Sequence, residues 1–413
     1  MSSVIAPLRS RPFRNLVIGS TVSRLGNSIA PVALAFAVLD LTGSAISLGI
    51  VVGARSLANV IFALLGGVVA DRLPRNVILV GSSLAGAVTQ GLVAVLVFER
   101  IDSVALLAAL SAVNGTVSAF ALPASVALIP QTVPAEQLVP ANAFARMGAN
   151  AASLLGLPLA GVVVAGLGSA WGIAVDAASF AVAALFFGLV RIPAVERAAP
   201  GGRSVLRDLI DGWQAFIART WLWVVVAAFG VLNMAFAGGV TVLGPVVADE
   251  TVGRRAWGFV LGAEAVGFLI GGLFALRLRM RRLLLFGVVC MLPLALPLFA
   301  LAAYTALPGL LVAFFVSGLG VEQFSVAWQT CMQRHVPPEL LARLTSYDMV
   351  GSFIAIPVGE VAAGPVSHAI GVRPTLIACG LVIVVAVIAM IASPSVRNLL
   401  ETANGATVET VSP

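Results

Sequence analysis

Twelve apolar stretches recur along this chain of 413 residues. Each is roughly 20 residues long, the length that an α-helix needs to cross the hydrocarbon layer of a bilayer. Hydrophobic residues make up 60% of the chain and charged residues only 10%, a composition that water-soluble domains do not have. We therefore predict an all-α membrane protein with twelve transmembrane helices. They centre near residues 27, 57, 88, 117, 158, 181, 233, 266, 293, 320, 357 and 383.

The basic residues predict the orientation of the chain. All 24 are arginine, which is typical of a GC-rich bacterial genome. With the N-terminus inside, 18 fall on the cytoplasmic side, four fall outside, and Arg24 and Arg55 lie within spans. This excess predicts a multi-pass protein of the bacterial inner (plasma) membrane with both termini cytoplasmic. The net charge of +6 is then a matter of topology and does not indicate a nucleic-acid partner.

The chain carries an internal repeat. Segments 66–81 and 271–287 share five residues at a constant offset of 205, and 133–138 resembles 336–341 at an offset of 203. These segments follow the second and eighth, and the fourth and tenth, predicted spans. Two six-helix halves with corresponding loops are the layout of a transporter built from parallel repeats, with its site between the halves.

The domain boundaries follow from this repeat and from a polar stretch in the middle of the chain. Ser204 is a candidate N-cap, and the apolar stripe that follows it predicts an amphipathic helix on the cytoplasmic face. We predict an N-terminal bundle (1–190), a linker with this helix (191–220), a C-terminal bundle (221–395) and a polar cytoplasmic tail (396–413).

Residues 67–75 resemble the loop signature G-x-x-x-D-[RK]-x-G-[RK] of the major facilitator superfamily. Pro74 replaces the second glycine of that signature. Segments 133–144, 320–330 and 336–352 are similar to the drug- and siderophore-exporter branch of the superfamily. The resemblance implies the major facilitator fold, with two pseudo-symmetric halves. It also implies a conformational gate, formed by Gly67, Asp71, Arg72 and Arg75 of this signature and by Pro158 and Gly161, which remain from the antiporter pattern G-P-x-x-G-G.

A polar stripe marks the tenth predicted span. Glu322, Ser325, Gln329 and Gln333 follow helical spacing, so they share one face that cannot contact lipid. Shorter stripes occur on the first and fourth spans, and Asn233 stands out on the seventh. The resemblance implies that these four spans line a central cavity. We therefore predict substrate contacts from Arg24, Asn27, Asn114, Ser118, Asn233, Ser325 and Gln329.

Three carboxylates inside spans are candidate proton carriers: Glu264, Glu322 and Glu360. A charge at mid-membrane costs roughly 2.5–3.5 kcal/mol on insertion scales, so a partner or a function must retain it. The alternative role of Glu322 is a structural hydrogen bond to a Gln or Trp side chain. For Glu264 it is a contact between the halves, and for Arg24 it is a carboxylate partner instead of a substrate anion.

Arg55 and Glu360 lie at the same predicted depth on the second and eleventh spans. The superfamily places these spans opposite each other across the two halves. We therefore predict that Arg55 and Glu360 pair when the outer side is closed and separate when it opens, which makes both residues part of the gate. The alternative is that each is satisfied within its own half. Pro357, just before Glu360, is expected to loosen the eleventh helix.

The chain contains no lysine, which excludes a phosphate-binding G-x-x-x-x-G-K-[ST] loop and hence ATP as its own energy source. His335 and His368 fall at opposite ends of spans, so we expect no metal site, and we expect no cofactor. We predict a monomeric secondary transporter, with protons, a small molecule and membrane lipid as its partners. The favoured activity is proton-coupled export of drugs, siderophores or natural products, including antibiotic efflux. A proton-coupled uptake symporter and a polytopic membrane enzyme are the alternatives.

Overall fold

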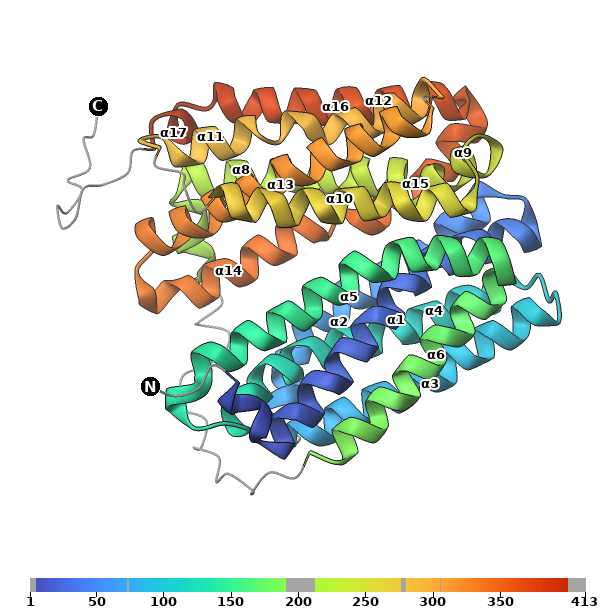
Figure 1. Cartoon of the computed structure of the whole chain (residues 1–413). Helices are drawn as coiled ribbons and strands as arrows, with labels where there is room; N and C mark the ends of the chain where they lie inside the picture. Colours follow the sequence, from blue (N-terminus) through green and yellow to red (C-terminus); the bar gives the residue numbers. More distant parts are fainter. Residues whose placement is uncertain (1–4, 73, 191–211, 276–279, 305, 400–413) are drawn as a thin grey trace.

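In a computed structural model, the chain forms two helical bundles (Figure 1). Twelve helices are long and apolar enough to cross a membrane, as the sequence predicts. The structure describes residues 5–72, 74–190, 212–275, 280–304 and 306–399, and of residues 64–72, 122, 123, 127, 339 and 342 it describes the backbone only.

The first bundle contains one unbroken helix for each of its six spans. Ser10 begins the first of them by accepting a hydrogen bond from the amide of Phe13, and Gly43 ends it in a left-handed conformation (φ 62°). Short 3₁₀ turns join some of the helices. The six helices are α1 (Arg11–Thr42), α2 (Ala45–Arg72), α3 (Arg75–Phe98), α4 (Val104–Leu128), α5 (Leu138–Leu167) and α6 (Ser169–Gly188).

Three spans of the second bundle are interrupted. The seventh passes through a π-helical turn at a Gly-Gly pair, the ninth through a 3₁₀ turn at prolines, and the eleventh breaks before Pro357. The helices are α8 (Thr220–Phe236), η4 (Ala237–Leu243), α9 (Gly244–Glu250), α10 (Arg254–Ala275), α11 (Leu283–Val289), η5 (Leu292–Ala295), α12 (Leu296–Ala302), α13 (Leu307–His335), α14 (Pro338–Phe353), α15 (Ile356–Ile370), α16 (Val372–Ala392) and α17 (Pro394–Arg397).

The outer surface of both bundles is apolar, as a lipid-facing surface must be. Large hydrophobic side chains are exposed on α3, where Val88 is 61% accessible, and on α16, where Val385 is 64% accessible. In the part of residues 191–220 that the structure describes, 212–217 form helical turns. Trp213 and Phe216 stack on each other, and both rings contact Tyr347 of α14 in a tilted arrangement. Residues 191–211 and 400–413, most of the predicted linker and tail, lie outside the described part.

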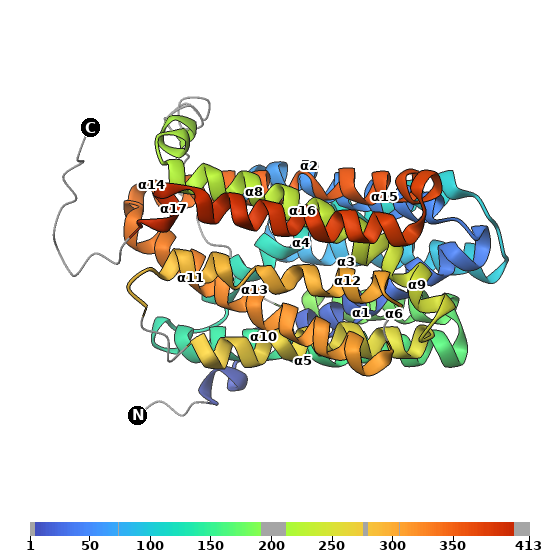
Figure 2. The same ribbon diagram turned by 90° about the horizontal axis from the view of Figure 1, so that it is seen from above.

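The two bundles approach each other at one end only. We call this the Asp40 end, because Asp40 lies in the last turn of α1, and we call the opposite end the Arg11 end. At the Asp40 end α2 packs on α15 and α5 packs on α10. Toward the Arg11 end the ribbons of the two bundles diverge (Figure 1), and Figure 2 shows the same helices from above.

Candidate functional site

An ion pair joins the halves at the Asp40 end. Arg254, the first residue of α10, donates from its two terminal nitrogens to the carboxylate of Asp40 on α1, at 2.9 and 2.5 Å. The same guanidinium bonds Asp249 and lies 4.9 Å from the ring centre of Phe36. Sequence reasoning assigned no role to Asp40 or Arg254.

Glycines bring α5 and α10 into backbone contact just below this ion pair. A Cβ on Gly161 would lie 2.9 Å from the Cα of Gly258, and a Cβ on Gly258 would lie 2.7 Å from the Cα of Gly161. The ring of Pro158 fills the space over Gly262. The structure therefore places both residues of the antiporter pattern, Pro158 and Gly161, at the interface between the halves.

A second glycine contact joins α2 to α15. Gly49 faces the backbone carbonyl of Glu360, and a Cβ on Gly53 would lie 3.8 Å from the Cβ of Glu360. One turn closer to the Asp40 end, Gly364 lies against the backbone of Ile46. Glu360 is thus buried where the halves meet, with only 4% of its surface accessible.

The predicted direct pair between Arg55 and Glu360 is not formed. The structure shows no ion pair within 4.0 Å between these two described residues. Arg55 instead reaches along its own half to the Oδ1 of Asn27, at 3.5 Å. Its charge still acts on Glu360 across the interface. One oxygen of Glu360, Oε2, has no hydrogen-bond partner among the described residues.

A second carboxylate, Asp176 of α6, faces Arg55 from within the first half. Asp176 is fully buried and accepts a hydrogen bond of 2.5 Å from Gln90 of α3, while Ser179 donates to it at 3.5 Å. Asp176 and Glu360 both interact electrostatically with Arg55. One arginine therefore lies between two carboxylates that belong to opposite halves.

The other two candidate proton carriers, Glu264 and Glu322, are half-buried and lie where α10 packs on α13. Glu322 lies over Gly271, and it interacts electrostatically with Arg146 of α5, in the other half. The backbone of Glu264 abuts Gly318, and the described residues give its carboxylate no ion pair or hydrogen bond.

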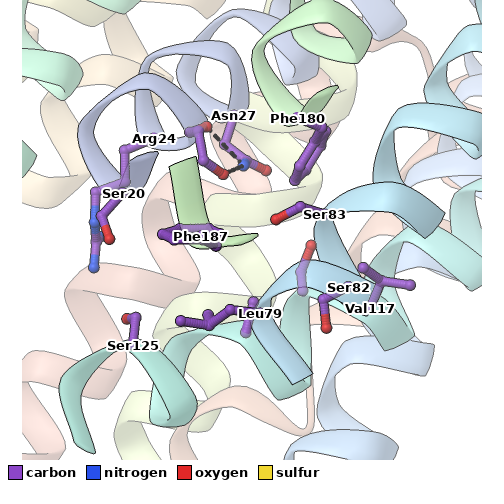
Figure 3. A pocket seen from close by; sticks show the side chains of 13 residues that line it. Ser20, Arg24, Asn27, Leu79, Ser82, Ser83, Val117, Ser125, Phe180 and Phe187 are labelled. Atoms are coloured by element: carbon purple, nitrogen blue, oxygen red, sulfur yellow. Dashed lines mark hydrogen bonds between the residues drawn. The ribbon is translucent and has the colours of Figure 1, made fainter. Parts of the chain in front are cut away.

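Two cavities lined by both polar and apolar side chains open within the first half. The first, of about 200 Å³, is lined by residues of α1, α3, α4 and α6 (Figure 3). The second, of about 250 Å³, lies between α1, α4 and α5. Of the predicted substrate contacts, Arg24, Asn27 and Ser118 line the first cavity and Arg24 lines both. Asn114, Asn233, Ser325 and Gln329 line neither.

Asn114 and Asn233 lie away from both cavities. Asn114 is 2% exposed, and its amide has no partner among the described residues. Asn233 donates at 2.8 Å to the carbonyl of Ser352, next to the break between α14 and α15. The predicted loosening before Glu360 is therefore present as a helix break, and Asn233 binds a carbonyl beside it.

The structure describes only part of the loop signature at residues 67–75. The structure describes the backbone of α2 to Arg72, but the surroundings of Gly67 and the side chains of Asp71 and Arg72 lie outside the described part. Arg75 begins α3. On the eleventh span, Asp348 accepts hydrogen bonds from Trp328 at 2.9 Å and Ser352 at 3.1 Å.

Comparison with known proteins agrees with this architecture. Residues 16–360 match the model of the Major Facilitator Superfamily. The chain is 26% identical to the multidrug efflux pump Tap of Mycolicibacterium fortuitum, over 94% of this chain and 97% of Tap. It is 24% identical to the macrolide efflux protein A of Streptococcus pyogenes, over 90% of this chain and 93% of the relative. A crystal structure of a variant of the nucleoside transporter NupG superposes with a TM-score of 0.77 at 15% identity, covering 92% of this chain and 99% of that one.

Two six-helix halves that meet at one end around buried charges define a secondary transporter of small molecules, and not an enzyme. The chain belongs to the Major Facilitator Superfamily.

Proposed function

We propose that this protein is a proton-coupled exporter of hydrophobic or amphipathic small molecules that works by alternating access in a bacterial plasma membrane. Two relatives that align over nine-tenths of the chain are efflux proteins, the pump Tap and the macrolide efflux protein A. The observation that carries the proposal is Glu360, a buried carboxylate with one unpartnered oxygen at the contact between the halves.

The arginine distribution orients the molecule. It favours cytoplasmic termini, so the Arg11 end faces the cytoplasm and the Asp40 end faces outward. The contacts of Arg254 and of the glycines then close the outer side, and this conformation faces inward. Export requires that these contacts open while substrate is bound.

The charges around Arg55 give a reason for proton coupling. If Arg55, Asp176 and Glu360 were all ionised, the cluster would carry a net charge of −1 in the apolar interior, which is costly. Asp176 receives hydrogen bonds from Gln90 and Ser179, which favour its charged form. The free oxygen belongs to Glu360, so Glu360 is the carboxylate that binds the proton when the outer side closes.

If the outer side closes only when Glu360 is neutral, then proton entry is coupled to substrate export, which is antiport. Glu360 meets outside water when α2 and α15 separate, takes up a proton there, and is buried in its neutral form on closure. Release of this proton toward the cytoplasm leaves a buried charge that destabilises the closed outer contact. The outer side then reopens and delivers the substrate.

Transport into everted membrane vesicles tests the direction. Two fluorescent probes of opposite charge, ethidium and 1-anilinonaphthalene-8-sulfonate, would be offered to respiring vesicles with and without the protein. We expect protein-dependent accumulation of at least one probe and its loss when a protonophore is added. Accumulation that survives the protonophore, accumulation only in right-side-out vesicles, or none at all would overturn the proposal.

A second experiment tests the assignment of the proton. Glu360→Gln mimics the protonated carboxylate, so we expect exchange of bound probe to persist while uphill transport is lost. Glu264→Gln and Glu322→Gln are the matched comparisons inside the membrane. Uphill transport by the Glu360→Gln protein at the wild-type rate would show that the proton binds elsewhere.

A further inference from the structure

The two cavities of the first half meet at one cation. Ser20, Arg24 and Ser125 line both cavities, so the two spaces form one chamber around the Arg24 guanidinium, which we call the Arg24 chamber. Figure 3 shows the Ser20 and Arg24 side chains next to each other on one face of α1, with Ser125 facing them from α4.

The lining of the Arg24 chamber is positively charged. Among the described residues, it includes two arginines, Arg24 and Arg146, and no acidic side chain. Arg146 interacts electrostatically with Glu322 of the other half. The guanidinium of Arg24 forms no ion pair within 4.0 Å and no hydrogen bond with any residue that the structure describes, while its backbone carbonyl accepts from Ser28. A half-buried guanidinium inside a membrane span therefore points into a cavity without a protein anion beside it.

The remaining lining has two kinds of surface. Hydroxyl groups form the first kind: those of Ser20 and Ser125 lie on the side of Arg24, and those of Ser82 and Ser83 from α3 lie apart from it (Figure 3). Apolar side chains form the rest, with Leu79, Phe180 and Phe187 around the first cavity. A guanidinium binds carboxylate or phosphate with two parallel hydrogen bonds, and hydroxyls can donate to the same oxygens.

We propose that the Arg24 chamber binds the anionic group of the transported compound, and that the substrates are amphipathic organic anions. The inference rests on the proposed function and narrows its substrate class. The carboxylate or phosphate lies against Arg24 and the neighbouring hydroxyls, and the apolar body lies against the aromatic wall.

The dimensions are consistent with this division. Pockets for whole drug-sized molecules measure roughly 300–1,000 Å³, and each cavity here is smaller. Each part of the chamber therefore suits one portion of a ligand. A molecule with its charge at Arg24 can extend an apolar portion into either cavity.

Binding of three matched probes to the protein in phosphatidylcholine nanodiscs, by titration calorimetry, tests the charge preference. The probes are 2-naphthoate, 2-naphthylmethanol and 2-naphthylmethylammonium, which share one ring and differ in charge. We expect the carboxylate to bind at least about tenfold more tightly than the other two, a difference of roughly 1.4 kcal/mol. Equal or tighter binding of the ammonium probe, or no binding of the carboxylate, would overturn the inference.

Variants locate the site. Arg24→Gln should weaken 2-naphthoate binding by about tenfold or more, whereas Arg24→Lys, which keeps the charge but loses the two parallel hydrogen bonds, should weaken binding less than Arg24→Gln does. Arg255→Gln removes an exposed arginine at the Asp40 end and is the control. Undiminished binding by a folded Arg24→Gln protein would place the anion elsewhere and reject the site.

The same titration in nanodiscs that contain phosphatidylglycerol separates a transported anion from a lipid headgroup. Unchanged affinity supports the substrate assignment, and competition by the anionic lipid assigns the chamber to lipid and overturns it. These measurements use no ion gradient. They can fail while gradient-driven export in everted vesicles persists, so failure of the anion inference is distinguishable from failure of the proposed function.

Discussion

Arg254 and Asp40 hold the first and eighth spans together by two hydrogen bonds from a single guanidinium, at 2.9 and 2.5 Å. The side chains are 25% and 35% exposed, so the pair lies at the rim of the contact between the halves. Asp249 holds the guanidinium from within its own half, and Ser169 donates to Asp40 at 2.9 Å. Both partners are therefore fixed before the halves meet.

Removing this ion pair should favour opening of the Asp40 end. Partly exposed pairs contribute roughly 0.2–1 kcal/mol, which corresponds to a shift of up to about fivefold in the ratio of closed to open molecules. We expect Asp40→Asn to increase the open fraction, measured by the distance between spin labels on the loops after α1 and before α10. The swap of Asp40→Arg with Arg254→Asp should recover part of the closure, and Arg255→Gln should change nothing. An unaltered distance distribution in Asp40→Asn would contradict this role.

The contact between Gly161 and Gly258 should tolerate no side chain. A methyl group at either position meets backbone, which cannot move aside as a flexible side chain can. Gly161→Ala should therefore keep α5 and α10 apart and trap the protein with the Asp40 end open. The measurement is the reactivity with a membrane-impermeant maleimide of a cysteine that replaces Ile46, whose backbone lies against Gly364 across the interface.

Gly166→Ala is the matched control, because the same helix offers open space around that Cβ. Its labelling and transport should equal those of the parent protein. Gly161→Ala with labelling as low as the control would show that the helices separate without cost, and would remove Gly161 from the gate.

Much of the fold follows from the sequence because hydropathy and helix length are local properties. The apolar stretches predict all twelve spans, and Pro357 predicts the loosened eleventh span, since proline cannot donate a backbone hydrogen bond. The same local reasoning explains why Asn27 and Ser118 line a cavity with Arg24. All three belong to polar stripes within membrane spans, and a polar stripe cannot face lipid.

The arrangement of the charges could not be predicted in the same way. Asp40 and Arg254 are 214 residues apart, and each is an ordinary charge at the end of a helix. Their pairing depends on the docking of two bundles, which no local pattern encodes. The predicted direct pair of Arg55 with Glu360 was wrong for the same reason. Equal depth in the membrane does not reveal that Arg55 lies closer to the side-chain oxygen of Asn27.

Loss of the Gln90 hydrogen bond should destabilise the first half. Gln90 donates to the buried carboxylate of Asp176 at 2.5 Å, and a buried charge that loses its partner costs roughly 1–3 kcal/mol or more. Gln90→Met keeps the length of the side chain and removes the donor, so we expect a lower unfolding temperature in detergent. Val88→Ala, at an exposed position two residues away, should have little effect. Equal unfolding temperatures for Gln90→Met and wild type would show that other donors suffice.

The last prediction concerns the break in the eleventh span. The amide of Ile354 still bonds the carbonyl of Val350, and regular bonding resumes from Gly359 to Ala355. Between these bonds the carbonyl of Ser352 accepts from Asn233 of α8 at 2.8 Å. The break therefore has a donor from a neighbouring helix, and it separates α14 from the α15 segment that carries Glu360 to the other half.

Asn233→Leu should leave this carbonyl without its donor and lower the stability by about 1–3 kcal/mol, seen as earlier unfolding in denaturant. Pro357→Ala restores an N–H to the helix and lets regular bonding extend across the break. The double variant Asn233→Leu with Pro357→Ala should thus regain stability while losing transport rate, because a continuous helix couples α15 to α14. If the double variant is no more stable than Asn233→Leu alone, then Asn233 does not act through the break.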